Sequence, residues 1–297
     1  MIEFEPIEIH HKALFTEINA IERSQNAGYS FGNVFLWHLT YQRFVARLGD
    51  RIAIEYKYPD EIFYAFPSGS GELKPAIEAL RAHAARQGRV LEIRCMTPTQ
   101  KTLLEEAYPG CFTYAEDRDN FDYIYDIGAF ATLSGKKLHG KRNFCNRFER
   151  EHSWRFEPLT AVHFEDCLSL LEEWDEEHSQ VNQEEQLAIE RAFRYWDQLD
   201  MLGGVLYTGE KLAAFTIGEV LTDDTVDVHF EKAVNNISGA YPMIAREFAR
   251  YLRATRPGIK YLNREEDMGI ENLRRAKEEW YPLFLLEKYT AVWSAEP

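Results

Sequence analysis

Three titratable side chains recur at every second position of the run Thr225–Lys232. Asp227, His229 and Glu231 alternate there with apolar residues, so the period of two of a β-strand would place all three on one face. A carboxylate or imidazole beside a substrate amine or hydroxyl can act as a general base, which typically contributes about 10²- to 10⁴-fold in rate. Two interpretations remain open: His229 or Glu231 is such a base, or the run is an edge strand with one solvated face.

A second polar cluster, Asn263–Gly269, reads Asn-Arg-Glu-Glu-Asp-Met-Gly and stands between an expected strand and an expected helix. Two of its three carboxylates, Glu265 and Asp267, are further candidates for the base. Asn263 and Arg264 are candidates for contacts with a substrate.

Lys277 lies four residues after Leu273, so a helix over Glu271–Trp280 would carry both on its apolar stripe. A lone ammonium is very costly to bury and needs an anionic partner. Glu265, Asp267 or a carboxylate or phosphate of the substrate could serve. The alternative is a structural ion pair, with the lysine stem lying along apolar surface.

The segment 136–155 concentrates positive charge in an acidic chain. It holds seven basic residues against two acidic ones, a net +5 where the whole chain is −15. The alternative to a binding function is a solvated helix face, but the poor helix formers Asn143 and Asn146 stand among the cations. Arginine forks match phosphate oxygens, so we expect the segment to bind phosphate. The candidate contacts are Lys137, Lys141, Arg142, Asn143, Asn146 and Arg147.

The turn after the Thr225–Lys232 strand contains Gly239 and leads into an expected helix. Backbone N–H groups at a helix N-terminus can hold phosphate, which makes Gly239 and Tyr241 candidate binding positions. A simple turn explains one glycine equally well.

Composition excludes several classes of protein. A net charge of −15 repels nucleic acid and anionic lipid outside a local basic patch, so DNA binding is not expected. The four cysteines are widely spaced, which predicts reduced thiols and no metal site. No apolar run approaches the ~20 residues that span a bilayer, and the N-terminus has no signal pattern, so we expect a cytoplasmic protein.

The elements that must position these residues are strands alternating with helices. Each half of the chain follows the order hairpin, strand, helix, strand, helix, strand, which predicts an α/β (α+β) chain with two similar domains. We place them at residues 1–127 and 128–297, with the basic segment as a helix over 128–152.

Four blocks together resemble a known family: Ser134–Phe148 (SGKKLHGKRNFCNRF), Val228–Ala233 (VHFEKA), Gly239–Ile244 (GAYPMI) and Asn263–Lys277 (NREEDMGIENLRRAK). The chain, from about residue 25 to 290, is similar to the C-terminal domain of phosphatidylglycerol lysyltransferase. More broadly it resembles the Fem aminoacyltransferases. The resemblance implies two tandem GNAT-type acyltransferase folds, with mixed sheets flanked by helices.

The resemblance also implies transfer of an aminoacyl group from aminoacyl-tRNA to an amine or hydroxyl of a lipid, peptide or small molecule. The tRNA would bind through the local basic patch, and a lipid acceptor is compatible with the family. The turn at Gly239 departs from the pyrophosphate-binding signature of GNAT enzymes. Tyr241 stands where that signature has a small residue, which lets the backbone approach the pyrophosphate. That departure weakens the case for acyl-CoA as donor and is compatible with aminoacyl-tRNA.

The leading hypothesis is therefore an acyl- or aminoacyltransferase whose second domain carries the site. Two alternatives stay open: a non-catalytic binding module on the same scaffold, and an acetyl-CoA-dependent N-acetyltransferase.

Overall fold

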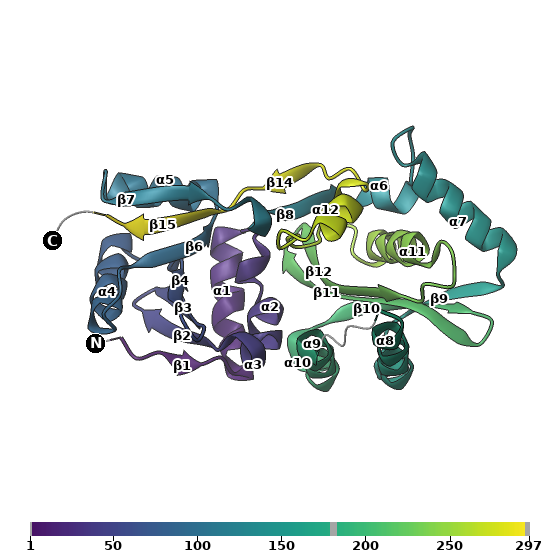
Figure 1. Cartoon of the computed structure of the whole chain (residues 1–297), viewed down its shortest axis with the longest axis horizontal. Helices are drawn as coiled ribbons and strands as arrows, with labels where there is room; N and C mark the ends of the chain where they lie inside the picture. Colours follow the sequence, from purple (N-terminus) through teal and green to yellow (C-terminus); the bar gives the residue numbers. More distant parts are fainter. Residues whose placement is uncertain (1, 179–182, 295–297) are drawn as a thin grey trace. The chain divides into compact units, whose positions relative to one another are not determined.

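The computed structural model describes residues 2–178 and 183–294. The chain divides into two compact units (Figure 1). Unit 1 consists of the chain up to Asp122, Glu266–Ile270 and the chain from Leu285 onward, and unit 2 of Tyr123–Glu265 and Glu271–Phe284. The predicted domain limits at 127 and 128 remain a prediction, but two short segments from the C-terminal part of the sequence belong to unit 1.

Unit 1 is built on an eight-stranded mixed sheet in the order β1-β2-β3-β4-β6-β15-β7, with β5 paired to β3. Its strands are β1 (Glu5–Pro6), β2 (Arg43–Leu48), β3 (Arg51–Lys57), β4 (Ile62–Ala65), β5 (Ser68–Gly69), β6 (Glu92–Met96), β7 (Phe112–Glu116) and β15 (Tyr289–Trp293). Its α-helices are α1 (Lys12–Glu22), α2 (Phe31–Leu36), α3 (His38–Tyr41), α4 (Leu73–Arg86) and α5 (Pro98–Ala107). Short 3-10 turns are η1 (Ile9–His11), η2 (Ala27–Tyr29) and η3 (Arg118–Asn120).

Alternation along the strands of unit 1 gives its sheet two different faces. Tyr64 and Ile93 point toward α4 and α5 and form the core with Ile77, Leu80 and Leu104. Helix α5 begins at Pro98, directly after its N-cap residue Thr97. Thr97 and Gln100 form a capping box there, and Pro98 takes the first helical position, where its missing N–H costs nothing.

The second mixed sheet, in the order β14-β8-β13-β12-β11-β10-β9, belongs to unit 2 except for the first residue of β8 and the last two of β14. The strands are β8 (Asp122–Asp126), β9 (Trp154–Pro158), β10 (Leu202–Thr208), β11 (Lys211–Thr222), β12 (Thr225–Ala233), β13 (Tyr261–Asn263) and β14 (Phe284–Leu286). The helices are α6 (Ile127–Thr132), α7 (His139–Glu151), α8 (Phe164–His178), α9 (Gln183–Arg194), α10 (Trp196–Leu199), α11 (Ala240–Thr255) and α12 (Glu271–Glu278), with η4 at Ala161–His163. Figure 1 shows α11 on one face of this sheet and α8 and α9 on the other.

The basic segment is not one helix over 128–152. Leu133 adopts a left-handed conformation with φ of 49°, and Gly135 has φ of 82°, so the chain breaks between α6 and α7. Cys145 and Phe148 are the buried residues of α7, which packs on α11. The prediction of a single helix is therefore corrected to two helices with a turn between them.

The strand β12, which carries the first candidate cluster, lies inside the sheet. It pairs with β11 on one side and, over Thr225–Asp227, with β13 on the other. The side chains of Asp227, His229 and Glu231 are at most 9% exposed, so β12 is not an edge strand with a solvated face. The parallel pairing with β13 ends at Asp227↔Asn263, whereas β12 itself continues to Ala233. A β-bulge also lies at this point, because Ile217 pairs with Phe230 whereas Gly218 pairs with Val228, leaving His229 as the extra residue.

Candidate functional site

His229, the bulged residue of β12, lies at the centre of a buried group of carboxylates in unit 2. Its Nδ1 is 2.9 Å from Glu265 and 3.8 Å from Asp227, and its Nε2 is 3.2 Å from Glu219. The side chains of His229 and Asp227 are fully buried, and that of Glu219 is 9% exposed. One imidazole therefore faces three carboxylates in a buried site.

The electrostatics of this group fix the protonation of the imidazole. Burial by itself lowers the pKa of His229, but the charge of Asp227 and the hydrogen bonds to Glu219 and Glu265 outweigh it and hold the pKa well above its ordinary value. A pKa raised in this way favours the charged imidazolium form of the ring. An imidazolium holds carboxylates together and does not accept a further proton, which removes His229 as a base in this state.

Glu231 is the other predicted base, and its surroundings differ. Its Oε1 accepts a hydrogen bond of 2.7 Å from Nη2 of Arg264, and its side chain is 9% exposed. Burial raises the pKa of Glu231 above its usual value against the opposing charges of Arg264 and Lys277. A raised pKa brings a carboxylate closer to the range of an effective base near neutral pH.

The cations beside Glu231 are held by aromatic rings and backbone. The guanidinium of Arg264 lies 5.7 to 6.0 Å from the ring centroids of Tyr125, Phe130 and Trp280. Lys277 donates hydrogen bonds to the backbone oxygens of Arg264 and Glu265, the second at 3.2 Å. Lys277 is thus turned inward, as the helical stripe predicted, but its described hydrogen bonds go to carbonyls.

The Asn263–Gly269 block, predicted as one cluster, is divided between the two units. Asn263 is buried and accepts a hydrogen bond from the backbone of Glu265, whose carboxylate turns to His229. Asp267 belongs to unit 1, where it is buried and pairs with Arg118 at 3.0 Å. The structure brings Glu265 to the His229 group and gives Asp267 a structural ion pair.

The predicted phosphate contacts on the basic segment are largely engaged within the protein. Arg142 donates to the backbone oxygens of Leu133 and Gly135, closing the turn between α6 and α7. Other cations of the segment form intramolecular contacts as well, whereas Asn143 and Asn146 are exposed. These contacts are Lys141 with Glu279 at 3.1 Å, Arg147 with Glu151 at 3.0 Å, and Lys137 over the ring of Tyr281 at 5.5 Å.

Gly239 has a packing role at the start of α11. Its φ of 92° is left-handed, and a Cβ at this position would lie 2.8 Å from the backbone oxygen of Phe144 in α7. Tyr241, two residues on, accepts a hydrogen bond of 3.2 Å from the indole of Trp174. The close approach of two helices therefore accounts for this glycine.

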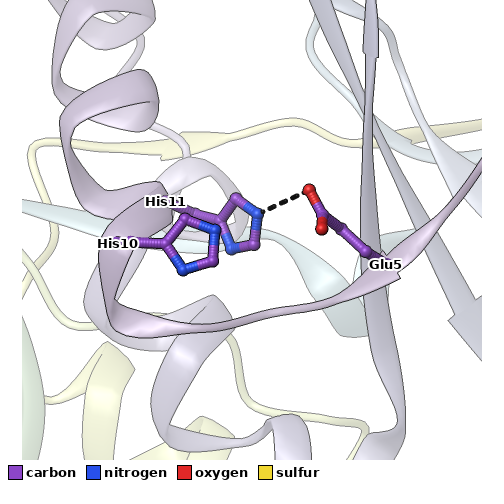
Figure 2. A group of neighbouring side chains, drawn as sticks. All are labelled: Glu5, His10 and His11. Carbon is purple, nitrogen blue, oxygen red and sulfur yellow. Dashed lines mark hydrogen bonds and ion pairs between the residues drawn. The ribbon is translucent and has the colours of Figure 1, made fainter.

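Two groups of side chains within the described ranges have the spacing of metal ligands. One is Asp227, His229 and Glu265, already described as an ion-paired group. The other is Glu5, His10 and His11 in unit 1 (Figure 2), where Nε2 of His11 meets the Glu5 carboxylate at 3.0 Å. Figure 2 shows the two imidazole rings side by side, and their centroids are 3.9 Å apart. Nδ1 of His11 also accepts the backbone N–H of Glu8 in a capping box, so His11 has a structural role at the start of η1.

A cavity lies in unit 1, and its lining includes none of the predicted site residues. It has a volume of about 680 Å³ and opens on the face of the sheet opposite α4 and α5. Sequence reasoning missed it because its lining comes from separate strands and turns. These lining residues include Tyr29, Arg43, Tyr56, Phe63, Arg94 and Lys288. One signal for the cavity was present in the run Arg51–Phe63. Its two strands form a hairpin in which the aromatic residues Tyr56 and Phe63 are paired positions.

Among the described residues, none of the helices combines the length and hydropathy that crossing a bilayer requires.

Most of the chain matches a single protein family. The family model described as "Phosphatidylglycerol lysyltransferase, C-terminal" matches residues 19–292. A conserved protein of unknown function from Bacteroides thetaiotaomicron is similar with a TM-score of 0.93 and 32% identity, covering 99% of this chain and 100% of that one. No match was found among curated protein sequences.

More distant likenesses concern the fold. The structure of L-PGS from Bacillus licheniformis has a TM-score of 0.68 at 18% identity and covers 99% of this chain and 94% of that one. FemX has a TM-score of 0.60 at 9% identity, with 97% and 96% covered. The predicted fold class, two tandem GNAT-type folds, is confirmed.

Proposed function

The chain belongs to the phosphatidylglycerol lysyltransferase C-terminal family, and from that premise we propose that it transfers an aminoacyl group from aminoacyl-tRNA to an amine or hydroxyl. The acceptor would be a lipid, a peptide or a small molecule. The fold of a transferase does not by itself fix the substrates, so the proposal depends on the chemistry of one site.

The observation that carries the proposal is the environment of Glu231. The hydrogen bond described for its carboxylate uses Oε1, which leaves Oε2 for a proton from the acceptor. Its pKa is raised by burial, and the pairing of β12 with β13 ends before this residue is reached. A base with a raised pKa, on a stretch of strand beyond its parallel partner, is suited to deprotonating a nucleophile.

The reaction we infer uses Glu231 twice. Its carboxylate accepts the proton of the acceptor amine or hydroxyl as that atom forms a bond to the ester carbon of the aminoacyl group. The bond from this carbon to the ribose oxygen of the tRNA then breaks, and the leaving oxygen takes the proton from Glu231. Arg264, 2.7 Å from the same carboxylate, would stabilise negative charge on the reacting oxygen.

The test is aminoacyl transfer with labelled lysyl- and alanyl-tRNA, offered phosphatidylglycerol vesicles or small amines. Transfer by the native chain and a loss of about 10²- to 10⁴-fold in Glu231→Gln would support the proposal. The matched control is Glu210→Gln, which removes a carboxylate that is 98% exposed on the β10–β11 hairpin. Absence of transfer with every donor and acceptor, or equal rates for the two variants, would refute it.

A second candidate function, binding without catalysis, is favoured by Lys277. This inward ammonium is already bonded to backbone oxygens of Arg264 and Glu265, so it has less capacity to hold a substrate anion. Saturable binding of aminoacyl-tRNA without turnover would establish this alternative.

A further inference from the structure

The cavity of unit 1 has the volume and lining of a small-molecule site. Its 680 Å³ falls within the range of about 300–1,000 Å³ that is typical of ligand pockets. Strands β2, β3, β4 and β6 provide one wall and the η2 turn another, so most of the lining comes from rigid elements. This cavity can bind a ligand whether or not unit 2 carries out a transferase reaction.

Arg43, at the start of β2, brings a positive charge to the cavity. The residue is 9% exposed, and its side-chain hydrogen bonds run from Nη1 to the backbone oxygen and side-chain oxygen of Asn33, at 2.8 and 2.9 Å. Its buried Nε has no hydrogen-bond partner in the described part of the chain. The hydrogen bonding of this guanidinium is therefore incomplete, which is costly for a buried charged group.

The other two cations of the lining are neutralised by carboxylates. Arg94 pairs with Glu61 and Glu92, each at 2.6 Å, and Lys288 pairs with Asp122 at 2.6 Å. Arg43 makes no such pair within residues 2–178 and 183–294; its fixed neighbours are a side-chain amide, a backbone oxygen and the rings of Tyr41 and Tyr56. A ligand anion would therefore form its ion pair with Arg43 in preference to Arg94 or Lys288, whose charges the carboxylates already neutralise.

Aromatic rings line the cavity beside Arg43. The rings of Tyr56 and Phe63 stack with centroids 4.8 Å apart and planes 7° apart, and Tyr58 continues the stack at 5.7 Å from Phe63. The faces of Tyr56 and Phe63 cover one another, and the guanidinium of Arg94 lies 4.0 Å from the ring centroid of Phe63, so a flat apolar group would pack against the edges of this stack.

The net negative charge of the lining favours a singly charged anion over a doubly charged one. Five carboxylates line the cavity against the three cations Arg43, Arg94 and Lys288. A dianion such as a phosphate monoester would be repelled by that excess, whereas a single carboxylate could reach Arg43 at lower cost. We propose that the unit 1 cavity binds a monocarboxylate with an aromatic body, its carboxylate paired with Arg43 and its ring against Tyr56 and Phe63.

The experiment compares three probes that share one ring system: 1-naphthaleneacetate, its neutral amide 1-naphthaleneacetamide, and 1-naphthyl phosphate. Each is titrated into the native full chain by calorimetry, with ligand-observed NMR for weak binding. We expect one site for the acetate and at least about tenfold weaker binding of the amide, since hydrogen bonds between charged partners are the strong ones. Equal binding of acetate and amide, tighter binding of the phosphate, or no binding of the acetate would overturn the proposal.

Variants then locate the site. Arg43→Gln should lose at least about tenfold in acetate affinity, whereas Arg47→Gln, an exposed arginine on the same strand, should bind as the native chain does. Ala65→Leu keeps Arg43 but fills part of the lining, and it should also weaken binding. If Arg43→Gln fails to fold, the comparison of the acetate with the amide on the native chain still shows whether binding requires a negative charge on the ligand. Native affinity in a folded Arg43→Gln or Ala65→Leu variant would refute the placement.

Discussion

Replacing His229 by Gln tests the buried charge group of unit 2. Glutamine is of similar size and can donate a hydrogen bond, but it carries no charge. In the variant, Asp227, Glu219 and Glu265 would keep their places around a neutral side chain. The imidazolium would no longer offset their mutual repulsion.

The magnitude follows from the burial of the group. Removing one partner of a buried ion pair typically costs about 3–5 kcal/mol, because the remaining charge is left buried and uncompensated. His229 is fully buried and lies within 3.2 Å of two carboxylates, so we expect that range for the loss in free energy of unfolding near pH 6.

The loss should shrink as the pH rises. The folded-state pKa of His229 is raised above the ordinary value of about 6.5, so the stability that its proton contributes is fully present below about pH 6.5. That contribution disappears as the pH rises through the folded-state pKa, with a slope of at most about 1.4 kcal/mol per pH unit. Above that pKa the native protein also has a neutral residue 229, and the difference from the variant becomes small.

The assay is hydrogen exchange of the β12 and β11 amides in increasing urea, followed by mass spectrometry at pH values from 6 to 9. Exchange of the β11 and β12 amides reports the free energy of unfolding of unit 2, even if unit 1 unfolds separately. The control is His139→Gln, an exposed histidine on α7 of the same unit. A loss below about 1 kcal/mol at pH 6, or a loss that does not depend on pH, would refute the reasoning.

Two further outcomes concern packing and ion pairs. Lys288→Met should destabilise unit 1 by about 3–5 kcal/mol in urea unfolding, because Asp122 would keep a fully buried charge, and Asp122→Asn in the same chain should recover part of that loss. An additive double variant would contradict the pairing. Gly239→Ala should lower the melting temperature more than Gly88→Ala, since both have left-handed φ but only at Gly239 would the new Cβ lie 2.8 Å from another helix. Equal shifts in the two variants would show that φ alone decides.

Local patterns in the sequence predicted many elements of the fold. The alternation of apolar and titratable residues over Thr225–Lys232 predicted strand β12, and Thr97 followed by Pro98 is a local signal for the start of α5. Gly209, with a left-handed φ of 59°, is likewise a local signal for the turn of the β10–β11 hairpin. These predictions succeeded because capping, turn geometry and strand period depend on residues close together in the chain.

The candidate sites depended on more than local pattern. Period alone placed His229 and Asp227 on one face, but the approach of Glu219 and Glu265 required pairing between strands and a left-handed Glu265, with φ of 55°. The net charge of segment 136–155 followed directly from the sequence. The sequence did not show that several of these cations form contacts within the protein. Arg142 was needed to close the turn before α7, and no spacing rule revealed that.

By itself, the sequence determined the α/β class, the family and the residue types available for chemistry, because periodicity and motif blocks are properties of the chain in order. Only the tertiary structure decided which charges neutralise one another and where a cavity remains. Arg43, Tyr56 and Arg94 are far apart in the sequence, and they line one cavity because β2, β3 and β6 are strands of a single sheet. Sheet order is set by the burial of apolar surface across the whole unit, which no short stretch of sequence encodes.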